Sequence, residues 1–476
     1  MFATKEELIK KYSEAIKEGN AAIFAGAGLS IASGYIDWKE LLRPFASQLG
    51  LDIEKENDYL AIAQYYRNER FGRASVNETI LSAFSKEAKE NPNIDIITRL
   101  PISTYWTTNY DHLIENGLEK SNRLADVKIE VDQLSCSKYD RDAVVYKMHG
   151  DVERPSRAVL TKDDYVLYDR SRKLFKTVLK GDLISKTFLF IGFSFEDPNL
   201  DYVLNQIHAL LDENIHEHYC FFRRVKKDGL SDKDYGYAQA RQELKAKDLA
   251  RYGIQTVFID EYSEITETLM AIETTVKHNN VFISGSAAEY GTWNKDDAER
   301  LAYEVARSLV RDDFRITSGF GFGIGSTVVN GALDEIYRSK YKHTEEHLCL
   351  RPFPQGIKDD DERKRLYTKY RKDMIAETGV SVFLFGNKNV SKDLTKKDIV
   401  DSDGCLEEFQ ISKENGNVII PIGSTGYVAK KILDEIKSDI NRYPYLEGYT
   451  DILEKTTDIS KIVETVLEII RKCSQI

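Results

Sequence analysis

Short strand-like runs alternate with helical patterns along the first half of the chain, and this alternation limits the possible folds more than any other feature. The runs are rich in β-branched and aromatic residues, and several end in Gly, Asn or His. Strands interleaved with helices form parallel sheets whose ligand sites lie at the carboxyl ends of the strands. The sequence therefore predicts an α/β fold. The runs are AAIFAGAG (21–28), STYWTTN (103–109), AVVYKMHG (143–150), TFLFIGFSF (187–195) and IQTVFID (254–260).

The same pattern begins again near residue 278. A helix whose apolar residues repeat at the spacing of one face, from Ile265 to Val276, ends at KHNN (277–280). A new strand and small-residue turn, VFISGS, follow at once from Val281. We therefore predict two α/β domains, residues 1–277 and 278–476. The later strand-like runs are FRITSGFGFGIGS (314–326), HLCLRPF (347–353), GVSVFLFGN (379–387) and NVIIPIG (417–423), and a terminal helix covers 459–470.

Composition excludes several classes of protein. The net charge of -11 argues against a surface that coats nucleic acid. Residues 1–20 carry charges throughout, which predicts an amphipathic helix and no signal peptide, and no apolar run approaches the roughly 20 residues of a membrane span. We expect a cytoplasmic protein. Its five cysteines form no CxxC pair, so we expect neither a structural zinc nor any other metal.

The turn in AAIFAGAGLS, residues 21–30, indicates a phosphate site. Gly26 and Gly28 suit a backbone that takes positive φ or approaches another group closely. A helix that opens at such a turn offers free N–H groups and the positive end of its dipole to an anion. The alternative is a tightly packed strand-to-helix turn without a ligand.

Polar residues end three other runs, and a doubly wound sheet brings such ends to one crevice. They are Asn109, His149, and Gly192 with Ser194, and Asp111 is expected in the first turn of the helix that follows Asn109. Each has a structural alternative: Asn109 as a helix N-cap, His149 as an ordinary strand-end histidine, and Ser194 as a cap or turn residue. Asp197 before Pro198 is typical of a helix start.

GAGLS, TTNYD, HGD and GFS, in this order, resemble the sirtuin-type (SIR2) NAD-binding domain over roughly residues 10–275. The resemblance implies NAD+ bound across the sheet edge. It places the pyrophosphate near Ala25, Gly26, Ala27 and Ser30, and the adenosine near Gly192 and Ser194. It further implies that Asn109 and Asp111 hold the nicotinamide ribose, with His149 as the catalytic histidine.

These residue types suit cleavage of the bond between nicotinamide and ribose. The leaving group is neutral, so the site needs to fix the ribose, position a nucleophile and accept a proton. Asn109 suits the first task or the orientation of a water molecule, and His149 suits the role of base at neutral pH. Sirtuin deacylases carry a zinc ribbon with paired cysteines, which this chain lacks. We therefore predict an NAD+ hydrolase that yields nicotinamide and ADP-ribose. The alternatives are an NAD-dependent protein deacylase, a non-enzymatic nucleotide sensor and an ADP-ribosyl transferase acting on protein.

The second half resembles the SLOG family of nucleotide-ligand sensors, on SGFGFGIGS, RPFPQG, YRKDMI, LFGNK and LEEF. A SIR2 domain followed by a SLOG domain is similar to effectors of Thoeris antiphage defence. This implies activation by a cyclic ADP-ribose isomer that a TIR-domain partner makes, and tetramers or larger assemblies.

Arg371 and Lys388 are then expected to clamp a pyrophosphate, while Glu408 accepts from ribose hydroxyls. The other expected contacts are Gly285, Ser286 and Gly323. A solvated face is the alternative for both cations, and the neighbouring Glu407 is an alternative to Glu408.

Overall fold

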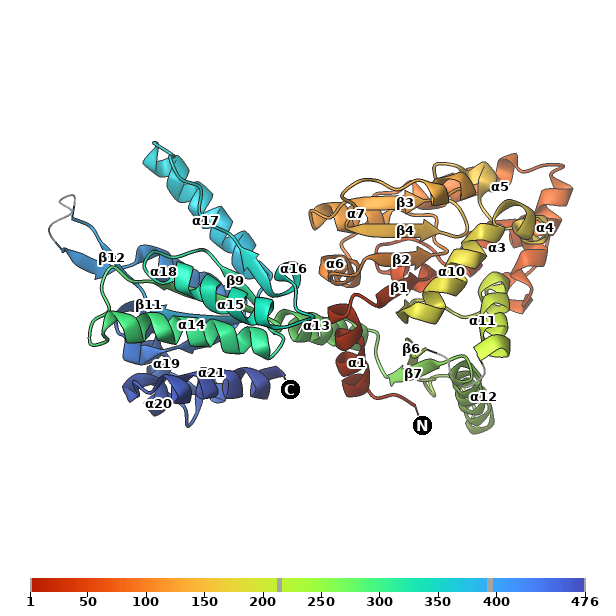
Figure 1. The fold of residues 1–476 in the computed structure, drawn as a ribbon. Helices are drawn as coiled ribbons and strands as arrows, with labels where there is room; N and C mark the ends of the chain where they lie inside the picture. The colour runs from red at the N-terminus through yellow and green to blue at the C-terminus, as the bar shows by residue number, and fades with distance from the viewer. Residues whose placement is uncertain (1, 212–215, 392–396, 475–476) are drawn as a thin grey trace. The chain divides into compact units, whose positions relative to one another are not determined.

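The computed structural model describes residues 2–211, 216–391 and 397–474. The chain divides into two units, residues 1–273 and 274–476, and the division falls inside helix α13 (Ser263–Lys277). The domain boundary predicted between 277 and 278 lies at the end of that helix. Each unit is an α/β body with a parallel sheet (Figure 1), so the predicted fold class is confirmed.

The first unit holds a seven-stranded parallel sheet in the order β3-β4-β2-β1-β5-β6-β7. The chain starts at β1 in the middle, continues to β2 on one side, and later crosses to β5 on the other. Ligands of open α/β sheets bind where the strand order reverses in this way. The strands are β1 (Ala21–Ala25), β2 (Thr104–Thr107), β3 (Ala125–Lys128), β4 (Ala143–Lys147), β5 (Thr187–Ile191), β6 (His218–Arg223) and β7 (Ile254–Ile259).

Helices connect these strands, and the predicted N-terminal helix is confirmed as α1. Thr4 caps α1 with a reciprocal bond to Glu7. All five predicted runs form strands, whereas β3 and β6 were not predicted. The helices are α1 (Lys5–Lys17), α2 (Ala27–Ile31), α3 (Trp38–Gln48), α4 (Tyr59–Glu69), α5 (Ala74–Phe84), α6 (Pro92–Arg99), α7 (Leu113–Lys120), α8 (Lys162–Val166), α9 (Tyr168–Ser171), α10 (Lys173–Ser185), α11 (Pro198–Leu211) and α12 (Asp232–Ala250).

The second unit holds a five-stranded parallel sheet in the order β10-β9-β8-β11-β14, with β8 in the middle. Its strands are β8 (Asn280–Ser286), β9 (Arg315–Ser318), β10 (Leu348–Leu350), β11 (Val380–Phe385) and β14 (Val418–Pro421). A separate antiparallel ribbon joins β12 (Asn387–Asn389) to β13 (Ile399–Asp401). The second unit thus repeats the topology in which the first strand lies at the reversal point.

Helices of the second unit include the predicted terminal helix, which is confirmed as α21. Helix α14 packs against α15 and α21. None of the described helices in either unit is long and apolar enough to cross a membrane. The helices are α14 (Lys295–Arg311), α15 (Gly325–Arg338), α16 (Thr344–His347), α17 (Asp360–Ala376), α18 (Asp403–Glu414), α19 (Tyr427–Ser438), α20 (Thr450–Lys455) and α21 (Ile459–Ser474).

Close backbone packing accounts for the glycines of the first turn. Gly26 and Gly28 lie against Gly192, which follows β5, and a Cβ on any of the three would come closer than 3.0 Å to the facing backbone. The N–H groups of Gly26 and Gly28 donate to the carbonyls of Ile191 and Gly192, both at 2.9 Å. These two N–H groups are therefore already used. The tight-packing alternative explains both glycines without a ligand.

Gly192 adds a second requirement, because its φ is +67° and side chains disfavour that region. Gly19 between α1 and β1 has a similar φ of +72° but nothing within 4 Å of an added Cβ. We expect Gly19→Ala to cost about 1 to 2 kcal/mol of unfolding free energy from backbone strain alone. Gly192→Ala should cost more than about 3 kcal/mol, because the clash adds to the strain. Urea unfolding of both variants measures this, and equal costs would show that the two loops do not need to touch.

Candidate active site

Three predicted site residues form one hydrogen-bonded group beyond the ends of β1 and β2. The Asn109 amide Nδ2 donates to the Gly26 carbonyl at 3.0 Å and to Ser30 Oγ at 2.9 Å. Ser30 Oγ in turn donates to Asp111 Oδ2 at 2.7 Å. All three side chains are buried. The structure therefore joins residues that lie about 80 positions apart in the sequence.

Two hydrogen bonds of Thr107, at the end of β2, hold the backbone of this turn in place. Its Oγ1 donates to the Ala25 carbonyl at 3.0 Å and accepts from the Asn109 N–H at 2.9 Å. Asp111 Oδ1 accepts from the Leu113 N–H at 3.1 Å, where α7 begins. Asp111 thus precedes the helix by two residues, a correction to its predicted place in the first turn. The N-cap alternative for Asn109 is wrong, because His112 occupies that position.

His149 lies just beyond β4 and contacts a carboxylate from another loop. It is 3% exposed, and its Nε2 lies 3.1 Å from Asp197 Oδ2. The hydroxyl of Tyr165 donates to the same oxygen at 2.8 Å. Burial alone would raise the pKa of Asp197, but the interaction with His149 and several hydrogen bonds outweigh it and lower the pKa. Asp197 is therefore an ionised partner for His149.

Asp197 also precedes α11 and caps its start, as its position before Pro198 predicts. Its Oδ1 accepts from the N–H groups of Asn199 and Leu200, both at 3.0 Å. One carboxylate therefore starts a helix and faces His149. The sequence predicted the role of Asp197 at the helix start but not its contact with His149.

The remaining predicted cofactor residues contribute backbone to this region. Ala25 ends β1, Ala27 begins α2, and Gly192 packs against the turn between them. Ser194 lies two residues beyond Gly192 and is exposed. It takes no part in the hydrogen-bonded group around Asn109 or in the pair of His149 and Asp197.

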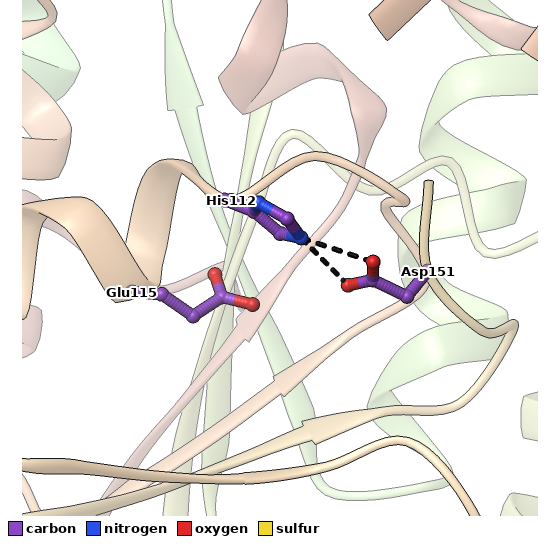
Figure 2. Close-up of side chains that lie close together, drawn as sticks. All are labelled: His112, Glu115 and Asp151. Carbon is purple, nitrogen blue, oxygen red and sulfur yellow. Dashed lines mark hydrogen bonds and ion pairs between the residues drawn. The ribbon is translucent and has the colours of Figure 1, made fainter. Parts of the chain in front are cut away.

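A second polar group, which sequence analysis missed, adjoins the residues that follow Asn109. Figure 2 shows His112 and Glu115 from one segment and Asp151 from another pointing toward each other. His112 Nε2 lies 3.0 Å from both oxygens of Asp151. The ammonium of Lys147, which is fully buried, lies 3.0 Å from Glu115 Oε1 and 2.5 Å from Asp151 Oδ2. A lysine that ends an apolar strand, followed four residues later by an aspartate, was the available sequence signal.

The geometry of His112, Glu115 and Asp151 also suits a metal ion, since their ligand atoms lie within 4.8 Å of one another. However, the ammonium of Lys147 already supplies a positive charge between the two carboxylates. Burial opposes ionisation of Asp151, but bonds from His112 and the charge of Lys147 lower its pKa to about 2. The hydrogen bond to Asp151 raises the pKa of His112. These cationic partners account for the cluster as an ion-pair network.

The predicted signal residues of the second unit centre on Arg371 of α17. Its Nη1 donates to Glu407 Oε2 at 2.6 Å and its Nε to Glu408 Oε1 at 3.3 Å. The guanidinium lies 4.8 Å from the centroid of the Phe353 ring. The Arg371 side chain is 13% exposed, so the solvated-face alternative is wrong for it. Glu408 is buried and accepts from Ser284 Oγ at 2.6 Å, and burial raises its pKa.

The other predicted signal residues lie in or near the middle strand β8: Gly285 and Ser286 end this strand, Lys388 lies in β12, and Gly323 lies in the turn before α15. Gly285 packs against the Leu384 carbonyl, and Gly323, with a φ of +83°, packs against the Ala287 carbonyl. Ser286 Oγ donates to the Asn387 carbonyl at 3.0 Å. Lys388 pairs at 2.5 Å with Asp403, the first residue of α18, the helix that also carries Glu407 and Glu408.

Comparison with known families divides the chain in the same order. A family model described as "SIR2-like domain" matches residues 103–254. A second, described as "Sir2- and TIR-associating SLOG family", matches residues 264–473.

Several relatives that match along their whole length share one name. "NAD(+) hydrolase ThsA" of Bacillus cereus (strain MSX-D12) is 45% identical over 474 residues, which cover 98% of each chain. The protein of that name from Acinetobacter baumannii (strain 532279) is 42% identical, over 99% of this chain and 100% of the relative. The Enterococcus faecium protein is 40% identical over 99% of both. Identity at this level along the full length of these relatives, with a SIR2-like domain followed by a SLOG domain, shows that the chain belongs to the ThsA family of NAD(+) hydrolases.

Proposed function

We propose that this chain hydrolyses NAD+ to nicotinamide and ADP-ribose in the first unit. The observation that carries this proposal is the buried group of Asn109, Ser30 and Asp111 at the reversal point of the sheet. Asn109 follows β2, and His149 follows the neighbouring strand β4. The names of the whole-length relatives support the choice of NAD+ as substrate. With this substrate we place the protein in the cytoplasm.

Asn109 is proposed to orient the nicotinamide ribose. Both hydrogens of its amide nitrogen are used by Gly26 and Ser30. The amide oxygen is then the group that accepts from a ribose hydroxyl or from the attacking water. The backbone contacts of the turn hold this oxygen in place, which is the kind of fixed orientation that accelerates reactions at a bound substrate.

His149 is proposed as the general base. The bond between the ribose carbon and the pyridinium nitrogen breaks, and its electron pair leaves with neutral nicotinamide. A water oxygen bonds to the same carbon, and the proton that it loses passes to His149. Asp197, ionised and 3.1 Å away, then stabilises the imidazolium, as a carboxylate does beside other catalytic histidines.

We propose that the second unit binds a cyclic ADP-ribose isomer that switches on the first. Arg371 has the planar, charged side chain that makes bidentate contact with a pyrophosphate. Its Nη1 and Nε donate to Glu407 and Glu408, so the ligand would take the place of these carboxylates. Glu408, once released from Arg371, is proposed to accept from ribose hydroxyls. Lys388, Gly285 and Ser286 at the end of β8, and the turn at Gly323 complete the proposed site. A TIR-domain partner as the source of this signal is supported by the family description, which names TIR association.

Gating by this signal requires differential binding. Moving a population from 1:99 to 99:1 takes about 5.5 kcal/mol of preference for the active arrangement. We propose a tetramer or larger assembly, in which several sites contribute to that preference.

Nicotinamide release tests the proposed reaction. The purified chain is incubated with adenine-labelled NAD+, alone and with a panel of cyclic ADP-ribose isomers, and the products are separated by chromatography. We expect free labelled ADP-ribose, and a rate that falls about 10²- to 10⁴-fold in His149→Ala through loss of the base. His208→Ala, which alters a half-buried histidine on α11 of the same unit, is the matched control and should keep the rate. Full turnover by His149→Ala would contradict the mechanism. Label retained on protein would indicate ADP-ribosyl transfer to protein instead of hydrolysis.

Arg371 tests the proposed signal site. Hydrogen bonds from a charged group contribute about 1.5 to 3 kcal/mol, so Arg371→Ala should raise the activator concentration for half-maximal rate at least about tenfold. Arg363→Ala on the same helix, where Arg363 pairs with Asp360, is the control and should leave that concentration unchanged. Titration of nicotinamide release measures both. Equal activation of Arg371→Ala and the unmodified chain would place the signal elsewhere.

A further inference from the structure

The proposed hydrolysis needs Asn109 and His149 in a fixed relation, although they follow different strands. β2 and β4 are neighbours, and Thr107 is the register partner of Lys147 at their ends. The Met148 N–H still donates to the Thr107 carbonyl at 2.9 Å. Beyond this point the segments after β2 and β4 leave the sheet, and the two candidate catalytic residues lie in those segments.

The side chain of Lys147, the last residue of β4, links the segment of His149 to the segment of Asn109. It lies two residues before His149, and its ammonium donates to the carbonyls of Tyr110 at 3.2 Å and Asp111 at 2.6 Å. These two carbonyls belong to the residues that directly follow Asn109. Lys147 thus connects the segment of His149 to the backbone that places Asn109.

The ammonium stays charged in a fully buried position. Burial lowers the pKa of Lys147, but Glu115 and Asp151 outweigh this effect and the pKa is raised. A buried charge is costly even when paired, and an apolar side chain of similar size is often as stabilising. Charge pairing alone is therefore a poor reason for a lysine here.

Asp151 strengthens the same connection. Besides Lys147, it contacts His112, which follows Asp111 directly, and its Oδ1 accepts from the Glu153 N–H at 2.8 Å. The segments 110–112 and 147–153 are therefore held together by side chains as well as by the sheet.

We propose, on the basis of the hydrolysis proposed above, that Lys147 is a positioning residue whose ammonium, through the carbonyls of Tyr110 and Asp111, fixes Asn109 relative to His149. It touches neither substrate nor the reacting atoms. Its effect falls on the rate of the bound complex more than on the binding of NAD+. The competing explanation is that Lys147 only neutralises Glu115 and Asp151.

Three variants separate these explanations. Lys147→Met removes the ammonium and leaves both carboxylates unbalanced. Lys147→Met with Glu115→Gln removes the ammonium and one buried negative charge together. Lys128→Met is the matched control, because Lys128 also ends a strand of this sheet, is buried, and pairs with Asp126 at 2.8 Å, but contacts none of the candidate site residues.

The measurements are kcat and KM for nicotinamide release, the thermal midpoint, and amide hydrogen exchange of the peptide spanning 107–113 without substrate. Misplacement by about 1 Å costs on the order of 10²-fold in rate, so we expect this loss of kcat in both Lys147 variants with little change in KM. The double variant should regain thermal stability but not kcat. Lys128→Met should lose stability and keep kcat. Exchange in 107–113 should be faster in both Lys147 variants than in Lys128→Met.

Recovery of both stability and kcat in the double variant would overturn the inference in favour of charge balance. An equal loss of kcat in Lys128→Met would overturn it in favour of general destabilisation. If the unmodified chain released no nicotinamide in any condition, the proposed function would fall. Hydrogen exchange would then still decide whether Lys147 fixes this segment, and equal exchange in all variants would show that it does not.

Discussion

The close contact between the backbones of Gly28 and Gly192, beside the middle strand β1, positions the candidate site of the first unit. Gly28 and Gly192 approach so closely that neither accepts a Cβ, and the loops after β1 and β5 are thereby locked together. This fixes the Gly26 carbonyl, to which Asn109 donates. The hydrogen bonds then continue through Ser30 to Asp111 and to the start of α7. The polar residues of the candidate site therefore take their places from a steric constraint in backbone that carries no reactive group.

The second unit applies the same constraint at its own middle strand. A Cβ on Gly321, in the loop after β9, would come closer than 3.0 Å to the Gly285 carbonyl of β8. Around this contact lie Ser284, Glu408 and Arg371, joined by hydrogen bonds. Both units thus place polar side chains next to a point where two backbones touch. The two units differ in the charge of these side chains. The first unit has His149 and the amide of Asn109, whereas the second has Arg371 with two glutamates.

The parallel α/β class and the residues at the strand ends were predictable, because apolar runs that end in Gly, Asn or His indicate the carboxyl edge of such a sheet. The ribbon strands β12 and β13 were not predicted, nor were β3 and β6 of the first unit, which both contain buried polar residues. β3 carries the buried pair Asp126 and Lys128. β6 begins at His218, whose ring accepts from the Phe188 N–H and whose pKa is lowered to about 3 by burial. From the sequence alone, a polar residue at a buried strand position is interpreted as a surface residue, because its partner lies in another segment.

The network around Lys147 and the pairing of His149 with Asp197 were hidden for the same reason. Each depends on partners from segments distant in sequence, so spacing along the chain does not reveal them. Asp197 was recognisable as a helix start, which is a local property, and its contact with His149 is not local. Local chemistry at strand ends was therefore accessible from the sequence, while the charges that hold those ends in place required the fold.

A crystal structure of His149→Ala with NAD+ bound tests most directly whether the edge beside β1 and β2 is the substrate site. We expect the nicotinamide ribose next to the amide oxygen of Asn109 and the truncated side chain at 149, with the diphosphate beside the turn at 26–28. The glycine contact and the bonds from Lys147 should be unchanged. NAD+ bound away from this turn, or with its nicotinamide ribose remote from Asn109, would contradict the assignment.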